Sequence, residues 1–170
     1  MESQARFAQA EDVPVLVTLM AEFYEESGFP LPRGAAAKAF KTIIAEPERD
    51  RVWLIDVESQ SVGYLVLTFS FSMEYGGLRG FVDDFFVRGT VRGRGLGGET
   101  LETARACCRT LGVRELVVET GPEDHPARGV YARAGFPTLM CWSETIVNRG
   151  HASPTQVATC SPRERDENRL

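Results

Sequence analysis

One segment limits the possible folds of this chain more than any other. Residues 82–101 read VDDFFVRGTVRGRGLGGETL. Residues typical of strands come first, then five glycines interleaved with three arginines, then residues with helical spacing. The segment therefore predicts a strand, a glycine-rich loop and a helix in succession. Glycines let the backbone approach a ligand, and the first N–H groups of a helix have no partner within it, so the loop is a candidate anion site.

Length and charge restrict what surrounds this segment. The chain has 170 residues, of which 43% are hydrophobic, which suits one domain with a single core. We expect this domain to span residues 1–147, followed by a polar, disordered tail over 148–170. The formal net charge of −5 argues against a nucleic-acid binder, which needs a basic face. Anion binding must then be local.

Cysteine spacing and hydropathy exclude other classes of site. Cys107, Cys108, Cys141 and Cys160 form no C-x-x-C pair and have no histidine at ligand spacing, so we expect no metal site. No apolar run approaches the ~18 residues of a membrane span, and the first residues contain no signal-peptide core. We therefore expect no membrane partner and a cytoplasmic protein.

Periodicity along the chain predicts an α/β fold of the mixed α+β kind. Helical spacing and end signals alternate with strand-like runs bounded by turn residues. Helices are expected over 13–27, 34–45, 99–111 and 126–135, and strands over 51–58, 61–73, 80–87, 115–120 and 138–147. This order predicts a mixed, largely antiparallel sheet flanked by helices.

Two motifs compete for the glycine-rich loop. Residues 93–98, GRGLGG, match the dinucleotide fingerprint G-x-G-x-x-G, and Glu119 lies where a ribose-binding acid would. However, five residues separate the first glycine from the preceding strand, whereas a dinucleotide turn follows its strand directly. A dinucleotide-binding oxidoreductase is thus the less favoured alternative. The ATP-binding P-loop is excluded because no G-K-[ST] follows.

The second motif takes Arg92, Gly95 and Gly97 as R-x-x-G-x-G at a helix start. With the strand FFV before it, and ELVVET and ARGVYARAGF after it, the segment resembles the GNAT superfamily of acetyl-coenzyme A (acetyl-CoA) dependent N-acetyltransferases. The resemblance spans about residues 5–147, and DDFFV is also similar to EDFFV of the diamine N-acetyltransferases. It implies a single GNAT-like domain with splayed central strands and acetyl-CoA as cofactor. Dimers are common in the superfamily, so a homodimer is the oligomer to test for.

The resemblance also implies a cofactor site. The strand carries a bulge and offers main-chain hydrogen bonds to the pantetheine arm, and the loop binds the pyrophosphate. Asp124 stands where many relatives have an asparagine that contacts the cofactor. The residues expected at this site are Phe85, Phe86, Val87, Arg92, Gly93, Arg94, Gly95, Leu96, Gly97, Gly98 and Asp124.

The chemistry of acetyl transfer points to two further residues. An alkyl ammonium has a pKa near 10.4, so its deprotonation at neutral pH costs about 4 to 5 kcal/mol, and a carboxylate can accept the proton. By resemblance, Asp83 is the base, acting through a water molecule, and Tyr131 is the acid that protonates the departing thiolate. Strand alternation places Asp83 and Asp84 on opposite faces. A purely structural role is the alternative for each.

Acidic residues elsewhere suggest the acceptor. Glu22, Glu25 and Glu26 lie toward the end of the first helix, and Glu74 lies at a strand end. Together with Asp84, we expect Glu25, Glu26 and Glu74 to attract a cationic amine. The acceptor is then a primary amine of a polyamine, of an amino-acid-like metabolite or of a lysine side chain. The remaining alternative is a non-catalytic acyl-CoA-binding module.

Overall fold

Five strands form one sheet in the computed structural model, which describes residues 3–118 and 125–135. The strands follow one another across the sheet in chain order. Each neighbouring pair from β1 to β4 is antiparallel, whereas β4 and β5 are parallel. The strands are β1 (Ser3–Phe7), β2 (Arg51–Val57), β3 (Gln60–Ser72), β4 (Gly77–Val87) and β5 (Glu115–Val118). This confirms the mixed, largely antiparallel sheet, and the described strands do not form the doubly wound parallel sheet of a dinucleotide-binding fold.

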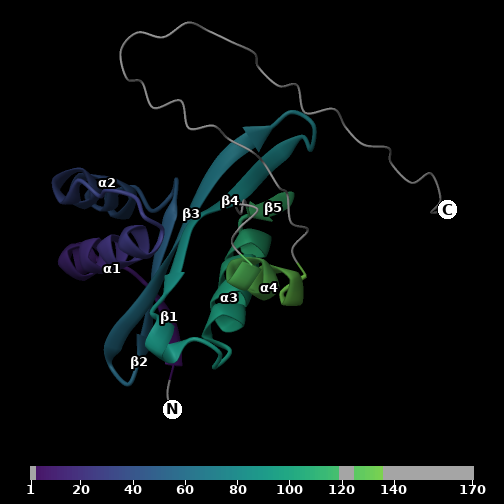
Figure 1. Ribbon diagram of the computed structural model, residues 1–170. Helices are drawn as coiled ribbons and strands as arrows, with labels where there is room; N and C mark the ends of the chain where they lie inside the picture. Colours follow the sequence, from purple (N-terminus) through teal and green to yellow (C-terminus); the bar gives the residue numbers. More distant parts are fainter. Residues whose placement is uncertain (1–2, 119–124, 136–170) are drawn as a thin grey trace, which may run out of the picture.

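Two pairs of helices cover the two faces of the sheet (Figure 1). On one face lie α1 (Val13–Glu26) and α2 (Arg33–Ala45), and on the other lie α3 (Leu96–Thr110) and α4 (His125–Arg133). Each pair buries its apolar face against the sheet, which is the arrangement expected of a domain with a core on either side of one sheet. The core beneath α1 includes Leu16, Leu19, Phe40, Tyr64 and Phe86, and the core beneath α3 includes Leu65, Leu67, Val82, Leu101 and Tyr131.

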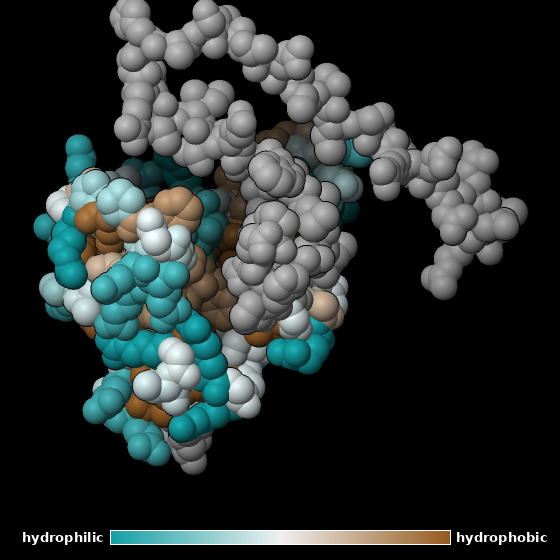
Figure 2. Space-filling model, viewed as in Figure 1, coloured by the Kyte–Doolittle hydropathy of each residue, from teal (hydrophilic) through white to brown (hydrophobic). Residues whose placement is uncertain are grey.

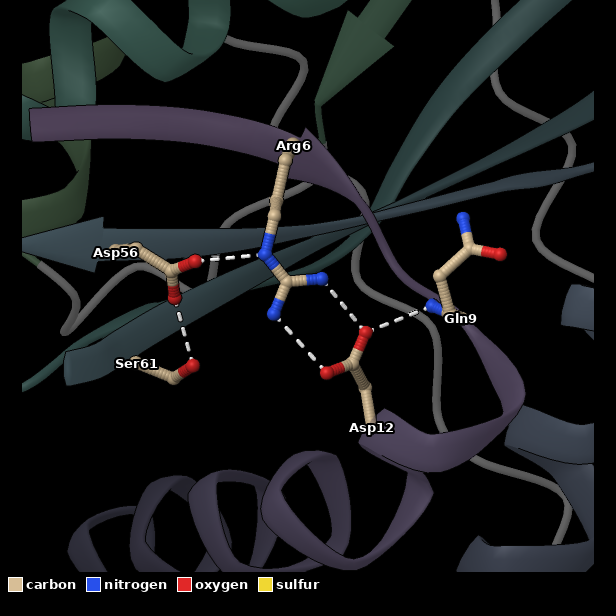
Figure 3. Close-up of polar contacts among 5 residues, drawn as sticks. All are labelled: Arg6, Gln9, Asp12, Asp56 and Ser61. Atoms are coloured by element: carbon tan, nitrogen blue, oxygen red, sulfur yellow. Dashed lines mark hydrogen bonds and ion pairs between the residues drawn. The ribbon is translucent and has the colours of Figure 1, made fainter. Parts of the chain in front are cut away.

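An N-terminal strand is the main element that periodicity does not predict. The sequence SQARF has no clear alternation, yet β1 pairs with β2 along its whole length. Arg6 then ties this strand to its surroundings (Figure 3). Its guanidinium donates to Asp56 of β2 and to Asp12, each at 2.7 Å. Asp12 precedes α1, but its carboxylate accepts from Arg6 and from the Gln9 N–H instead of capping that helix.

Several predicted features lie outside the described residues. These are the strand over 138–147, the tail over 148–170, Glu119 and Asp124. Within the described part of the chain, none of the helices is long and apolar enough to span a membrane.

Candidate active site

Strand β4 contains a bulge at the pair of aspartates. Val82 pairs with Leu67 of β3, and Asp84 pairs with the adjacent Val66, so Asp83 has no partner in the ladder. A bulge of this kind inserts one residue, bends the strand and re-aims the side chains that follow. Asp83 is therefore the inserted residue.

The bulge changes which face the later residues of β4 point to. Val82 packs in the core beneath α3, whereas Phe86, four residues later, packs in the core beneath α1. In a regular strand these residues would share a face, so the insertion has inverted the alternation. The charges of both Asp83 and Asp84 act on Tyr24 of α1. The expectation that strand alternation places Asp83 and Asp84 on opposite faces is therefore wrong at this bulge. Both carboxylates lie within electrostatic reach of α1.

The two carboxylates have raised pKa values. Burial, above all, raises the pKa of Asp84 to about 6; the charge of Asp83 acts in the same direction, and the hydrogen bond from Tyr64 opposes it. That bond joins the Tyr64 hydroxyl to Oδ2 of Asp84 over 3.0 Å. Partial burial also raises the pKa of Asp83, and the charge of Asp50 raises it further. Because Asp83 is exposed as a residue, surrounding water limits its shift. Both carboxylates are therefore more basic than that of free aspartate.

Replacing the buried acid should stabilise the protein. The folded pKa of Asp84 lies above its ordinary value of 3.8, so the native state binds more protons between pH 4 and 6 and stability falls as pH rises through this window. Asp84→Asn keeps an oxygen that can accept from Tyr64 but carries no charge. We expect its free energy of unfolding at pH 7.5 to exceed that of the wild type by on the order of 1–3 kcal/mol, measured by denaturant unfolding.

The matching control is pH 3.5, well below the pKa of about 6 of Asp84, where this carboxyl is protonated in the folded wild type. The difference between the two proteins should shrink toward zero there. Equal stabilities at pH 7.5 would show that Asp84 is not under electrostatic strain.

Tyr131 lies on the face of the sheet that α3 and α4 cover, opposite the α1 face. It is 6% exposed, belongs to α4 and packs its ring against Phe85, with 6.2 Å between ring centroids. The bulge places Phe85 on this face, one residue from Phe86 on the opposite face. The end of β4 thus has Tyr131 of α4, the predicted proton donor, on one side. Its own Asp83 and Asp84 lie toward the other side.

The edge of β4 that faces β5 lies between the two faces of the sheet. The parallel ladder with β5 runs over four residue pairs and ends at Val82 and Val118 in the described part of the chain. Residues 83–87 continue β4 past that point. In the space-filling view, hydrophobic residues are visible beside the α1–α2 side of this face (Figure 2).

The glycine-rich loop leads from β4 into α3. Gly95 precedes the helix with φ of 90° and ψ of −14°, a left-handed conformation that favours glycine. Its carbonyl accepts the first backbone bond of the helix, from Glu99 at 3.1 Å. Gly97 is required for close packing, since a Cβ there would lie 3.1 Å from Val130 of α4 and 3.6 Å from Phe85. These contacts place the start of α3 against α4 and against Phe85 of β4.

The arginines beside this loop are engaged by α1. Arg88 makes a two-pronged ion pair with Glu22, with both contacts at 2.7 Å, and Arg92 pairs with Glu26 at 2.7 Å. The guanidinium of Arg88 holds the pKa of Glu22 below its ordinary value. Both arginines therefore join the last turns of α1 to the segment between β4 and α3.

The remaining predicted residues are less closely grouped. Glu25 is exposed near the end of α1, and Glu74 lies in the turn at the tip of the β3–β4 hairpin, far along β4 from the bulge. The structure does not bring Glu74 together with the others. Arg94 reaches the Thr90 carbonyl at 3.5 Å.

Three residues that interact with the two aspartates are absent from the sequence-based prediction. They are Tyr24 of α1, Asp50 of the loop before β2 and Tyr64 of β3, and each has an electrostatic interaction with Asp83 or Asp84. The Asp50 carboxylate also accepts from the Phe69 N–H at 3.2 Å. No local signal marks these residues, because only the pairing of β2, β3 and β4 brings them together. We call Tyr24, Asp50, Tyr64, Asp83 and Asp84 the tyrosine–aspartate cluster.

Comparison with solved structures finds the same fold. An integron cassette protein from the mobile metagenome of Cole Harbour Salt Marsh is 51% identical, with 94% of this chain and 92% of that chain covered and a TM-score of 0.73. A predicted acetyltransferase with acetyl-CoA from Clostridium acetobutylicum is 16% identical over 89% and 100% of the two chains, with a TM-score of 0.72.

A third similar structure is that of AAC(6')-Iy in complex with a bisubstrate analog, CoA-S-monomethyl-acetylneamine. It is 14% identical over 85% of this chain and 99% of that chain, with a TM-score of 0.72. At this identity the likeness concerns the fold alone. No curated protein matches the chain.

The family comparison agrees with the motif and the fold. The acetyltransferase (GNAT) family matches residues 16–136, which include most of α1, the bulged strand β4, the glycine-rich loop and Tyr131. This match confirms the expectation of an acyltransferase that the R-x-x-G-x-G motif raised. The chain belongs to the acetyltransferase (GNAT) family.

Proposed function

We propose that this protein transfers the acetyl group of acetyl-CoA to a primary amine, carried by a polyamine, an amino-acid-like metabolite or a lysine side chain. The observation that carries the proposal is the end of β4, where Asp83 and Tyr131 flank the strand just past the end of the β5 ladder. A thioester held along this edge would have a base on the α1 side and an acid on the α4 side. The nitrogen–carbon bond then forms as the carbon–sulfur bond breaks.

The donor site is compatible with the residues present. Acetyl-CoA supplies a thioester, a pantetheine arm with amide groups and a pyrophosphate. The N–H groups at the start of α3 suit the pyrophosphate, and no atom of the described residues lies within 4 Å of a Cβ built on Gly93 or Gly98, which leaves room for a ligand. The main chain of residues 83–87 suits the amide groups of the arm by β-type hydrogen bonding.

The acceptor side supports an ammonium ion as the incoming group. Three aspartates of the tyrosine–aspartate cluster place negative charge next to the bulge, which favours a cation over a neutral alcohol. Asp83, whose pKa is raised, accepts a proton from the ammonium through a water molecule more readily than an ordinary aspartate would. The neutral amine that results is the nucleophile.

The acid side supports protonation of the leaving group. Tyr131 is buried beside Phe85, and its ring is held by that contact at the strand edge. A phenol with a pKa near 10 can give its proton to an alkyl thiolate. The acetylated nitrogen gives up its second proton, which returns Tyr131 to the phenol. The products are then an N-acetylated amine, a free thiol and the proton taken by Asp83.

A thiol-release assay over a panel of amines tests the proposal. Turnover with polyamines, amino-acid derivatives or lysine peptides supports it and ranks the acceptors. Binding of acetyl-CoA without turnover of any amine would favour the non-catalytic alternative. Absence of acetyl-CoA binding by calorimetry would contradict the proposal altogether.

Alanine at the helix start should weaken cofactor binding. Gly95→Ala must adopt a left-handed conformation that costs about 1–2 kcal/mol, so the loop relaxes away from the geometry that aims its N–H groups. We expect the Kd for CoA to rise about tenfold, measured by calorimetry. Gly34→Ala, which lies in the first turn of α2 with open space around its Cβ, is the matched control and should bind CoA like the wild type. Unchanged affinity in Gly95→Ala would remove this loop from the donor site.

A further inference from the structure

The ion pair between Glu26 and Arg92 connects two parts of the site that the sequence treats separately. Nη2 of Arg92 lies 2.7 Å from Oε2 of Glu26 in the last turn of α1. Nε of the same guanidinium donates to the Val87 carbonyl at 2.6 Å, and the guanidinium stacks over the Phe86 ring at 5.6 Å. Three contacts therefore fix the side chain that comes directly before Gly93.

A second ion pair one helical turn away acts on the other end of the same segment. Glu22 and Glu26 are four residues apart on α1, and their partners Arg88 and Arg92 are four residues apart on either side of the short 3-10 helix η2 (Gly89–Val91). Arg88 also donates to the Ser61 carbonyl at 3.1 Å. Helix α1 thus holds the segment from β4 to the glycine-rich loop at both of its ends.

Such an anchor matters because glycines make up part of the loop. Gly93 and Gly95 both have positive φ, and glycines there contribute no side chain that could fix the loop. The direction in which the N–H groups of the loop point is therefore set by the residues that precede it. Among these, Arg92 is the last one with side-chain contacts to another element.

We propose that Glu26 is a positioning residue for the cofactor loop, acting through Arg92, and not part of the acceptor site. This inference rests on the proposed function, since it assumes that the loop binds CoA. The carboxylate of Glu26 already has Arg92 as its partner. Both side chains are 48% exposed, so water solvates the rest of the ion pair and the Glu26 charge needs no amine to balance it. Arg92 in turn is a brace between α1 and β4 as well as a positive charge near the loop.

A role of Glu26 as a negative charge and a role as a positioning residue predict opposite changes in CoA affinity, so the inference can be tested. If Glu26 mattered only as a negative charge near an anion site, its removal would strengthen CoA binding. If it positions the loop, its removal weakens CoA binding because Arg92 loses one of its three contacts. The sign of the change therefore distinguishes the two roles.

The experiment is calorimetric titration of the full-length protein with CoA. We expect Glu26→Gln to raise the Kd about two- to fivefold, in line with a half-exposed ion pair, and Arg92→Gln to raise it further. The double variant should bind like Arg92→Gln alone, because the two residues act through one contact. Glu11→Gln, an exposed acid before the other end of α1, is the control and should match the wild type. Thermal unfolding of each variant checks that it is folded.

Steady-state kinetics supply the second measurement. Glu26→Gln should raise the KM for acetyl-CoA and leave the KM for the amine unchanged. Unchanged or tighter CoA binding, or a rise in the amine KM alone, would overturn the inference and leave the proposed function standing. A wild-type protein that does not bind CoA would overturn both.

Discussion

Tyr131→Phe is expected to lower kcat about 100- to 1,000-fold and to leave the Kd for CoA within twofold of the wild-type value. Phenylalanine keeps the ring that packs against Phe85, so the fold of α4 and the shape of the strand edge are preserved. Only the proton that the hydroxyl gives to the thiolate is lost. A 100-fold loss corresponds to about 2.7 kcal/mol of transition-state stabilisation.

The measurement combines the thiol-release assay with calorimetry. Tyr75→Phe is the matched control, because Tyr75 is 43% exposed in the turn of the β3–β4 hairpin, away from the end of β4. A kcat within threefold of the wild type for Tyr131→Phe would exclude this residue as the acid. It would also revive the alternative of a non-catalytic acyl-CoA-binding module if Asp83→Asn were equally without effect.

Asp83→Asn is expected to lower kcat/KM about 100-fold at pH 7, with a loss that shrinks steadily as the pH approaches 10. The reason is the acceptor: near pH 10.4 half of an alkyl amine is already neutral, so the base has less to do. A pH-dependent loss therefore identifies a proton acceptor. A loss that stays constant with pH would instead indicate a structural or binding role.

The pH profile of the variant needs two comparisons. Asp83→Glu restores a carboxylate and should recover a large part of the activity at pH 7, because a water-mediated contact tolerates one more methylene. Glu48→Gln, an exposed acid in the loop before β2, should follow the wild-type profile throughout. If Asp84→Asn, and not Asp83→Asn, showed the pH-dependent loss, the base would be reassigned to Asp84.

The stability effect expected of Asp84→Asn and the basicity of its carboxylate have a common origin. Asp84→Asn should stabilise the protein because burial makes the charge of Asp84 costly, and the same burial makes this carboxylate more basic. Proteins commonly accept a destabilised group where chemistry requires it. The tyrosine–aspartate cluster has the properties of such a compromise.

Much of the fold follows from local features of the sequence. The apolar spacing of residues 13–26 specifies α1, and Gly28, with φ of 74°, follows its end. The succession of strand, glycine-rich loop and helix in residues 82–101 is confirmed as β4, the loop and α3. These features are readable because helix periodicity, turn chemistry and helix starts depend on residues a few positions apart.

Other features depend on partners that are distant in the sequence. β1 forms because the edge of β2 offers it a ladder, and its own five residues carry no alternation that would predict it. The bulge at Asp83 exists only relative to the pairing of β4 with β3, so the sequence of β4 alone gives the wrong faces for the residues around it.

The chain's sequence by itself determined the family motif, the order of the elements from α1 to α4 and the candidacy of Asp83 and Tyr131. Only the tertiary structure decided that the charges of Asp83 and Asp84 both act on Tyr24 of α1, and that Arg92 is bound by Glu26. The physical reason is that a motif is a local pattern of conformational preferences and spacing. The face of a side chain after a bulge, and the partner of an ion pair 66 residues away, are set by packing between elements.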